Sequence, residues 1–306
     1  MWRGIEAYAS DLDSAATDLA GALMRGELAL FLGAGISIDA NLPSWSSLVI
    51  RCCEATGISS DDITPQIGSD TLRLRADQVE AHFLESTDYI KCVHDSLYAT
   101  YPGLSQPTSL LHAIGALMMG SRRGSVRDIV TLNLDNVLET YLALHGYVPE
   151  VVTEPQRLRR NVDVTVYHPH GFLPKNQQDL WTKRIVLSQE SFDQALDDEG
   201  PWKQQIRQMV TTKMPLAVGL SFSDPVLTSV ISGAKKLIEK EGRPAAFWLM
   251  KKPETPEEIR IMNDAIPAMK KRKIVPVVLD SFDNYPKFLL SICQHAANEM
   301  QEQFKS

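Results

Sequence analysis

The chain has 306 residues with ordinary apolar and charged fractions, enough for one large domain or two ordinary ones with a normal core. Its net charge of -7 argues against a broad nucleic-acid-binding surface. The four cysteines form no C-x-x-C pair, so neither a structural zinc site nor a disulfide framework is predicted. No apolar run reaches the roughly 20 residues of a membrane span and no signal peptide is visible, so we expect a cytoplasmic protein.

Short apolar runs predict six buried strands, at residues 28–32, 128–132, 162–167, 216–219, 245–250 and 274–279. Helical patterns lie between them, and strands that alternate with helices indicate a mostly parallel sheet covered on both faces. Pro276 cannot donate a hydrogen bond to a neighbouring strand, which favours an edge position for the last run. The sequence therefore predicts an α/β fold with a Rossmann-like, doubly wound sheet of six strands.

Two of the predicted helices carry clear start signals. Asp224 is suited to cap a helix that begins at Pro225. Thr255 and Glu258 fit a capping box, and the basic run 270–273 suits the negative end of the helix that follows it. We interpret that basic run as a solvated helix end and not as a nucleic-acid site.

Two mostly helical stretches, about 46–126 and 175–212, fit the sheet poorly and are predicted to form a helical insertion module. The Rossmann core is expected at about 27–45, 127–174 and 213–282. No sharp change in composition separates the two, so we expect residues 1–306 to form a single domain.

The first strand ends in Gly33-Ala34-Gly35, with Ser37 close behind. Ligands of doubly wound folds bind beyond the carboxyl ends of the strands, and glycines there let the backbone approach a phosphate while the next helix points its N–H groups at it. The third position of the G-x-G-x-x-G pattern is Ile38, so the match is incomplete. A tight turn without a ligand is an equally good interpretation.

Four ordered motifs strengthen the ligand interpretation: "GAGIS" with "LPSW", "TLNLDNVLE", "VYHPHGFL" and "VGLSFSDPVL". They resemble, in the right order, the nucleotide loop, the Thr-x-Asn-x-Asp motif, the catalytic histidine strand and the Gly-x-Ser strand end of the sirtuin superfamily. The resemblance extends over roughly residues 28–280 and implies a site for NAD+.

Departures from the sirtuin pattern indicate which branch the chain resembles. The two cysteine pairs of the zinc module of protein deacylases are absent, and Pro43 is followed by Ser44 and Trp45 where deacylases usually have Asp-Phe-Arg. This form resembles the zinc-less bacterial sirtuin-like NADases of anti-phage defence, which implies hydrolysis of NAD+ to nicotinamide and ADP-ribose and needs no metal. An NAD-dependent deacylase and a non-catalytic NAD or ADP-ribose sensor remain as alternatives.

The resemblance assigns the chemistry to Asn133 and His170. The amide of Asn133 is suited to hold a ribose hydroxyl or the attacking water, and the imidazole of His170 is the candidate general base. Asp135 either orients Asn133 or contacts the nicotinamide riboside, and it could equally cap the helix that follows. His168 is interpreted as a packed or hydrogen-bonding neighbour of His170, and the other possibility is a metal site built from both histidines.

Further residues are assigned to cofactor binding. Gly33, Ala34, Gly35 and Ser37 are expected at the phosphates, and Trp45 at the nicotinamide pocket, although Trp45 could equally be a core residue. The other expected contacts follow later strands: Gly219 and Ser221 at the phosphate or a ribose, and Asp280 at the adenine or its ribose. Ser221 could also be a simple turn serine.

Regulation is expected to come from assembly, because no separate sensor domain is recognisable in the sequence. We expect a homo-oligomer. Relatives of this size imply a protein partner, either a HerA-type ATPase, which the resemblance slightly favours, or a short Argonaute-like protein. Direct binding to nucleic acid or to a membrane is not expected. The stretch 46–126 follows the glycine loop and is the natural lid.

Overall fold

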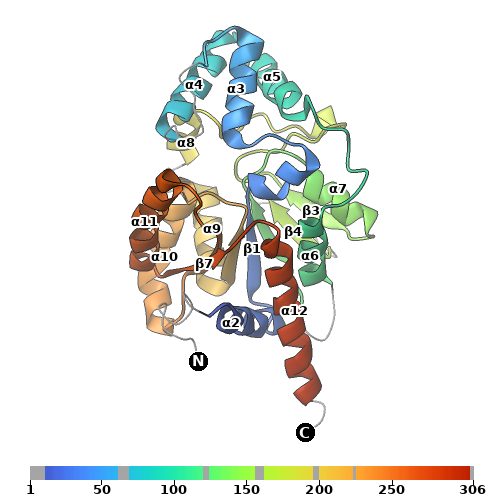
Figure 1. Ribbon diagram of the computed structural model, residues 1–306. Coiled ribbons are helices and arrows are strands. Elements are labelled where there is room, and N and C mark those ends of the chain that lie inside the picture. Colours follow the sequence, from blue (N-terminus) through green and yellow to red (C-terminus); the bar gives the residue numbers. More distant parts are fainter. Residues whose placement is uncertain are drawn as a thin grey trace.

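A computed structural model describes residues 11–60, 69–119, 124–155, 162–195, 200–222 and 225–303 of the protein. Its centre is a seven-stranded sheet in the order β3-β4-β2-β1-β5-β6-β7, and all neighbouring strands are parallel (Figure 1). The strands are β1 (Leu28–Leu32), β2 (Asp128–Thr131), β3 (Pro149–Val152), β4 (Val164–Tyr167), β5 (Met214–Val218), β6 (Ala246–Lys251) and β7 (Ile274–Leu279).

The predicted α/β fold with a parallel sheet is confirmed, but the predicted number of six strands is wrong. The strand missed is β3, whose four residues Pro-Glu-Val-Val do not form an apolar run. It pairs with β4 at one edge of the sheet, where a proline at the first position costs little. The edge position predicted for the strand with Pro276 is confirmed, because β7 closes the opposite edge.

The strand order places a point of reversal beside β1. From β1 the chain builds β2, β3 and β4 on one side and then returns to add β5, β6 and β7 on the other. Connections from β1 and β5 therefore leave toward opposite faces of the sheet, which opens a crevice at their carboxyl ends. The glycine loop follows β1 and Gly219 follows β5, so both lie at this point.

Helices cover both faces of the sheet. Side chains of β1 alternate, so that Leu28, Leu30 and Leu32 join one buried cluster while Ala29 and Phe31 join the other. The first cluster is completed by α2 (Leu12–Met24), α6 (Ser109–Met118), α7 (Val137–Leu144) and α12 (Asn284–Gln303). The second is completed by α9 (Pro201–Thr212), α10 (Pro225–Glu241) and α11 (Pro256–Lys271).

Four further helices form a layer beyond the carboxyl ends of the strands, at the top of Figure 1. They are α3 (Trp45–Thr56), α4 (Ser69–His82), α5 (Ser86–Tyr98) and α8 (Gln189–Ala195), and we call them the helical layer. Two helices within the predicted module ranges, α6 and α9, pack on the sheet faces instead. The helical layer is therefore smaller than the sequence ranges suggested.

The predicted capping box of α11 is confirmed, because the Thr255 hydroxyl accepts from the Glu258 N–H and the Glu258 carboxylate accepts from the Thr255 N–H. Lys270 and Lys271 lie in the last turn of that helix, as expected. The predicted cap Asp224 lies outside the described residues.

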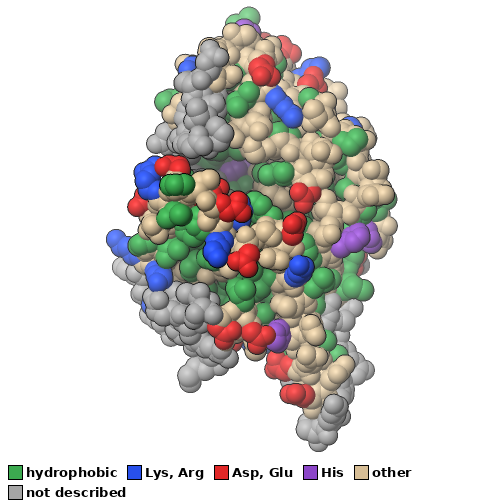
Figure 2. Space-filling model, viewed as in Figure 1, with side chains coloured by type: hydrophobic (Ala, Val, Ile, Leu, Met, Phe, Trp, Pro, Cys, Tyr) green, Lys and Arg blue, Asp and Glu red, His purple; other side chains and the backbone are tan. Residues whose placement is uncertain are grey.

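The surface carries charges of both signs. On the face drawn in Figure 2, acidic and basic side chains are interspersed, and the surface is hollowed between the helical layer and the part of the molecule that holds the sheet. In the ranges that the structure describes, none of the helices has the length and apolar character needed to cross a bilayer.

Candidate active site

The loops after β1 and β5 touch each other backbone to backbone. The Gly33 N–H donates to the Val218 carbonyl at 3.1 Å, and the Gly35 N–H donates to the Gly219 carbonyl at 3.0 Å. A Cβ atom on Gly35 would lie 2.7 Å from the Gly219 Cα, and one on Gly33 would lie 2.6 Å from the Gly219 carbonyl oxygen. Glycine is therefore required here by the contact between the loops, whether or not a phosphate also binds.

Two short 3-10 turns, η1 (Ala34–Ile36) and η2 (Ile38–Ala40), follow β1. The first α-helix after the glycines is α3, which begins only at Trp45. Two 3-10 turns therefore precede the helix expected after the glycines, and the expected contact of its N–H groups with a phosphate stays a prediction. The N–H groups of Gly33 and Gly35 are bound to carbonyls of the β5 loop, so this loop differs from an open anion nest.

Replacing Gly35 with alanine should lower the free energy of unfolding by about 2–3 kcal/mol, because the new methyl group would meet a backbone that cannot easily move. Gly21→Ala in α2 is the matched control. A Cβ there meets only the end of the Arg25 side chain. Because alanine favours a helix more than glycine does, the free energy of unfolding should rise by up to about 1 kcal/mol. Urea denaturation measures both, and equal stabilities of the two variants would contradict the loop-contact argument.

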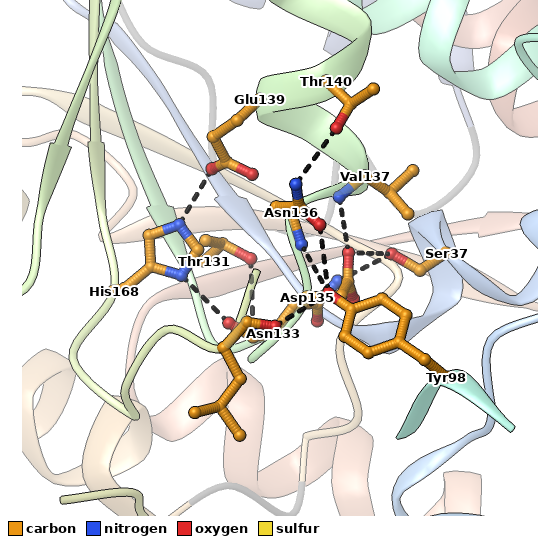
Figure 3. A network of polar contacts seen from close by, with 11 residues as sticks. Ser37, Tyr98, Thr131, Asn133, Asp135, Asn136, Val137, Glu139, Thr140 and His168 are labelled. Carbon is orange, nitrogen blue, oxygen red and sulfur yellow. Dashed lines mark hydrogen bonds and ion pairs between the residues drawn. The ribbon is translucent and has the colours of Figure 1, made fainter. Parts of the chain in front are cut away.

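A buried chain of polar groups joins the ends of β1 and β2 (Figure 3). The Asn133 Nδ2 donates to the Ser37 Oγ at 3.1 Å, and the Ser37 Oγ donates to the Asp135 Oδ1 at 3.1 Å. All three side chains are buried. The two strands are neighbours, so their carboxyl ends bring Ser37, Asn133 and Asp135 together. The Ser37 hydroxyl, which was expected to donate to a ligand, donates to Asp135 instead.

Asp135 also accepts from the Val137 N–H at 2.9 Å, at the first turn of α7. The predicted role at the helix start therefore has a structural counterpart, while Ser37 stands between Asp135 and the Asn133 amide, and a contact of Asp135 with the nicotinamide riboside stays a prediction. Burial raises the pKa of Asp135 to about 6 from the ordinary value of 3.8, while the Val137 N–H lowers it. The charge of Glu139 raises this pKa further, and Ser37 and His168 lower it.

The raised pKa of Asp135 predicts a stability change with pH. The folded state keeps the carboxyl protonated at a pH where the unfolded chain has lost the proton, so the stabilisation is complete below about pH 4 and is lost as the pH rises through about 6. The free energy of unfolding of Asp135→Asn, taken relative to that of wild type, should therefore rise by about 3 kcal/mol between pH 4 and pH 7.5. Urea denaturation at both pH values tests this, with Asp39→Asn as the exposed control. If the free energies of unfolding of Asp135→Asn and wild type differed by the same amount at both pH values, the prediction would be contradicted.

His170 lies in the turn after β4, and its ring is buried. The ring packs edge-on against Phe192 of α8 with centroids 5.4 Å apart, and Trp45 of α3 packs on the same phenyl ring at 6.0 Å. Two predicted site residues are thus joined through Phe192, which carried no signal in the sequence. Gly171 has a φ of +106°, and a Cβ there would lie 2.9 Å from the Arg184 carbonyl oxygen, so only glycine suits this turn.

The His168 ring contacts Asn133 and Glu139. Its Nδ1 lies 3.0 Å from the Asn133 carbonyl oxygen, and its Nε2 lies 2.8 Å from the Glu139 Oε1. Because both ring nitrogens are engaged by protein groups, a metal site shared with His170 would lack this ligand. The interpretation of His168 as a hydrogen-bonding neighbour fits these contacts.

Tyr98, at the end of α5, connects the helical layer to the site. Its hydroxyl lies 2.8 Å from the Leu173 carbonyl and 3.0 Å from the Asn136 Oδ1, and it accepts from the Asn136 N–H at 3.3 Å. The Lys175 N–H donates to the same Asn136 Oδ1 at 3.2 Å. Sequence reasoning missed Tyr98 and Asn136, although Asn136 stands within the "TLNLDNVLE" motif.

The remaining predicted residues lie outside the buried cluster. Gly219 makes the loop contact described above, with a φ of +66°. Ser221 is exposed beyond β5. Asp280 follows the edge strand β7, is 83% exposed and lies 3.7 Å from the Lys252 Nζ. Roles of Ser221 and Asp280 in cofactor binding stay predictions.

Comparisons with known proteins bear on this site. Residues 127–274, which contain Asn133 and His170, match the SIR2-like domain family. The chain is 23% identical over 235 residues to the NAD(+) hydrolase ThsA of Enterococcus faecium, and the match covers 76% of this chain and 44% of ThsA. The chain therefore matches less than half the length of that relative. The resemblance to sirtuins that the motifs predicted is confirmed by these matches.

Among solved structures, a Sir2 homologue in complex with NAD is similar at 12% sequence identity and a TM-score of 0.46. The alignment covers 91% of this chain and 94% of that one.

Proposed function

We propose that this protein is an NAD+ hydrolase that cleaves NAD+ to nicotinamide and ADP-ribose. The observation that carries the proposal is the meeting of Ser37, Asn133 and Asp135 in one buried cluster beside the point of strand reversal. Ligands of doubly wound folds bind at such a point. The similarity to a protein named as an NAD(+) hydrolase supports this choice of reaction.

The reaction requires little acid catalysis from the protein. The bond between the ribose carbon and the nicotinamide nitrogen breaks, and its electron pair neutralises the cationic ring as the ring leaves. A water oxygen then bonds to the ribose carbon and loses one proton. In this proposal His170 accepts that proton, and the amide of Asn133 holds the water or a ribose hydroxyl in place. The buried setting of both side chains favours exclusion of other water.

The proposal extends to a role as the effector of an anti-phage defence system that empties the NAD+ pool of the infected cytoplasm. Control would come from self-assembly and from a partner such as a HerA-type ATPase or, alternatively, a short Argonaute-like protein. The helical layer suits such control, because α5 ends at Tyr98, which contacts Leu173 and Asn136, and Phe192 of α8 packs on the His170 ring. A partner that binds a closed state of the protein more tightly than the open state by about 2.7 kcal/mol would change the activity 100-fold.

Incubation of the purified protein with NAD+, with and without an acyl-lysine peptide, tests the reaction. We expect nicotinamide and ADP-ribose in equal amounts in both samples. Product formation that requires the peptide would instead identify a deacylase. Tight binding of NAD+ or ADP-ribose without any turnover, over a wide range of protein concentrations, would identify a sensor.

A further inference from the structure

His168 lies between the two residues to which the proposed reaction assigns its chemistry. It precedes His170 by two positions at the end of β4, and its ring reaches across to the Asn133 carbonyl oxygen, 3.0 Å from Nδ1. The side chain is 1% exposed. A single buried ring thus ties the loop that carries the candidate base to the residue that carries the candidate amide (Figure 3).

The contacts of this ring fix the position of its protons. A carbonyl oxygen only accepts hydrogen bonds, so Nδ1 must carry a hydrogen. Nε2 lies 2.8 Å from the Glu139 Oε1. If Nε2 and the carboxylate were both unprotonated, two acceptors would face each other in a buried place. One proton must therefore lie between His168 and Glu139, as an imidazolium with a carboxylate or as an imidazole with a carboxylic acid.

An aromatic contact adds to the two hydrogen bonds of the His168 ring. The Phe172 ring packs against the imidazole with centroids 4.6 Å apart, which holds the ring from a third side. The His168 ring is therefore kept in one orientation by two hydrogen bonds and an aromatic contact.

We propose that Glu139 and His168 form a positioning pair that sets the place of Asn133 relative to His170. Neither residue of the pair is assigned a contact with the substrate. Glu139 holds the His168 ring, His168 holds the Asn133 main chain, and the Asn133 amide then donates to Ser37. This inference rests on the proposed NAD+ hydrolysis for its effect on rate, but the hydrogen-bond chain itself can be tested without turnover.

Two substitutions separate positioning from mere packing. Glu139→Gln can donate its amide N–H to an unprotonated Nε2, so that Nδ1–H still donates to Asn133. Glu139→Ala leaves Nε2 without this partner. We expect Glu139→Ala to lower kcat for NAD+ roughly 10- to 100-fold with the dissociation constant of NAD+ within about threefold of wild type. Glu139→Gln should stay within about threefold in both.

The control is Glu150→Ala, which removes a different buried glutamate, on the edge strand β3 in register with Thr165 of β4. The Glu150→Ala variant shows how much kcat changes when the protein is merely destabilised. An unchanged kcat in Glu139→Ala, or an equal loss of kcat in Glu139→Gln and Glu139→Ala, would overturn the positioning role.

NMR of the 15N-labelled protein without NAD+ supplies a readout that does not depend on turnover. Glu139→Ala should shift the side-chain amide signals of Asn133 and weaken the His168 Nδ1–H signal through faster exchange, whereas Glu139→Gln should preserve both. Unmoved Asn133 signals in Glu139→Ala would overturn the inference. A wild-type protein that shows these signals but cleaves no NAD+ would contradict the proposed function while leaving the hydrogen-bond pair in place.

Discussion

Replacing His170 with alanine should abolish NAD+ cleavage and leave the fold intact. The imidazole is the group assigned to take the proton of the attacking water, and removal of a general base typically costs 10²–10⁴-fold in rate. The substitution leaves the Val186 N–H free to donate to the residue 170 carbonyl as it does now, at 2.8 Å, so the turn should keep its shape. Nicotinamide release measures the rate, and circular dichroism checks the fold.

The control for His170→Ala is His112→Ala, because His112 is exposed on α6. His168→Ala is a poor control, since it would leave Glu139 buried without its partner. The loss of rate in His168→Ala should be milder than that in His170→Ala and should be accompanied by a loss of stability. Hydrolysis at the wild-type rate by a folded His170→Ala protein would rule out the role as base.

Asn133→Ala should lower turnover by about 10²-fold or more, the usual scale for one well-placed polar group at a reacting centre. Binding of NAD+ should persist, because the phosphates are not assigned to this residue. Calorimetry measures binding and single-turnover kinetics measures cleavage of bound NAD+. If binding were lost while bound NAD+ was cleaved normally, Asn133 would be an anchor for the ligand.

Asn136→Ala is the comparison for that experiment. Asn136 stands three residues after Asn133, and its side chain contacts Tyr98 and Lys175 instead of Ser37. The substitution therefore disturbs the same loop without touching the Asn133 amide. We expect it to lose stability while its turnover falls less than that of Asn133→Ala.

Strands with both faces buried were predictable from the sequence. All five residues of β1 are buried, and the run Leu-Ala-Leu-Phe-Leu reports this directly. The edge strand β3 was not predictable in this way, because only alternate residues are buried and a proline and a glutamate interrupt the run. Helices α6 and α9 showed helical patterns, but the pattern alone does not say which layer a helix joins.

The candidate site was predictable only as far as strand neighbours determine it. Ser37 and Asp135 meet because β1 and β2 are adjacent and parallel. Contacts that depend on the helical layer, such as Tyr98 on Asn136 and Phe192 on His170, join distant segments through packing that no local pattern records. The glycines were noticed, but their contact with Gly219 required the fold.

Product analysis in H₂¹⁸O tests most directly whether this site cleaves NAD+ with water. The purified protein, over a wide range of concentrations, is incubated with NAD+ alone, and the products are examined by mass spectrometry. We predict one nicotinamide for each ADP-ribose and a single ¹⁸O atom in the ADP-ribose, with no heavy product from the His170→Ala protein. NAD+ left intact at every concentration, or a heavy product formed equally by the His170→Ala protein, would contradict the account.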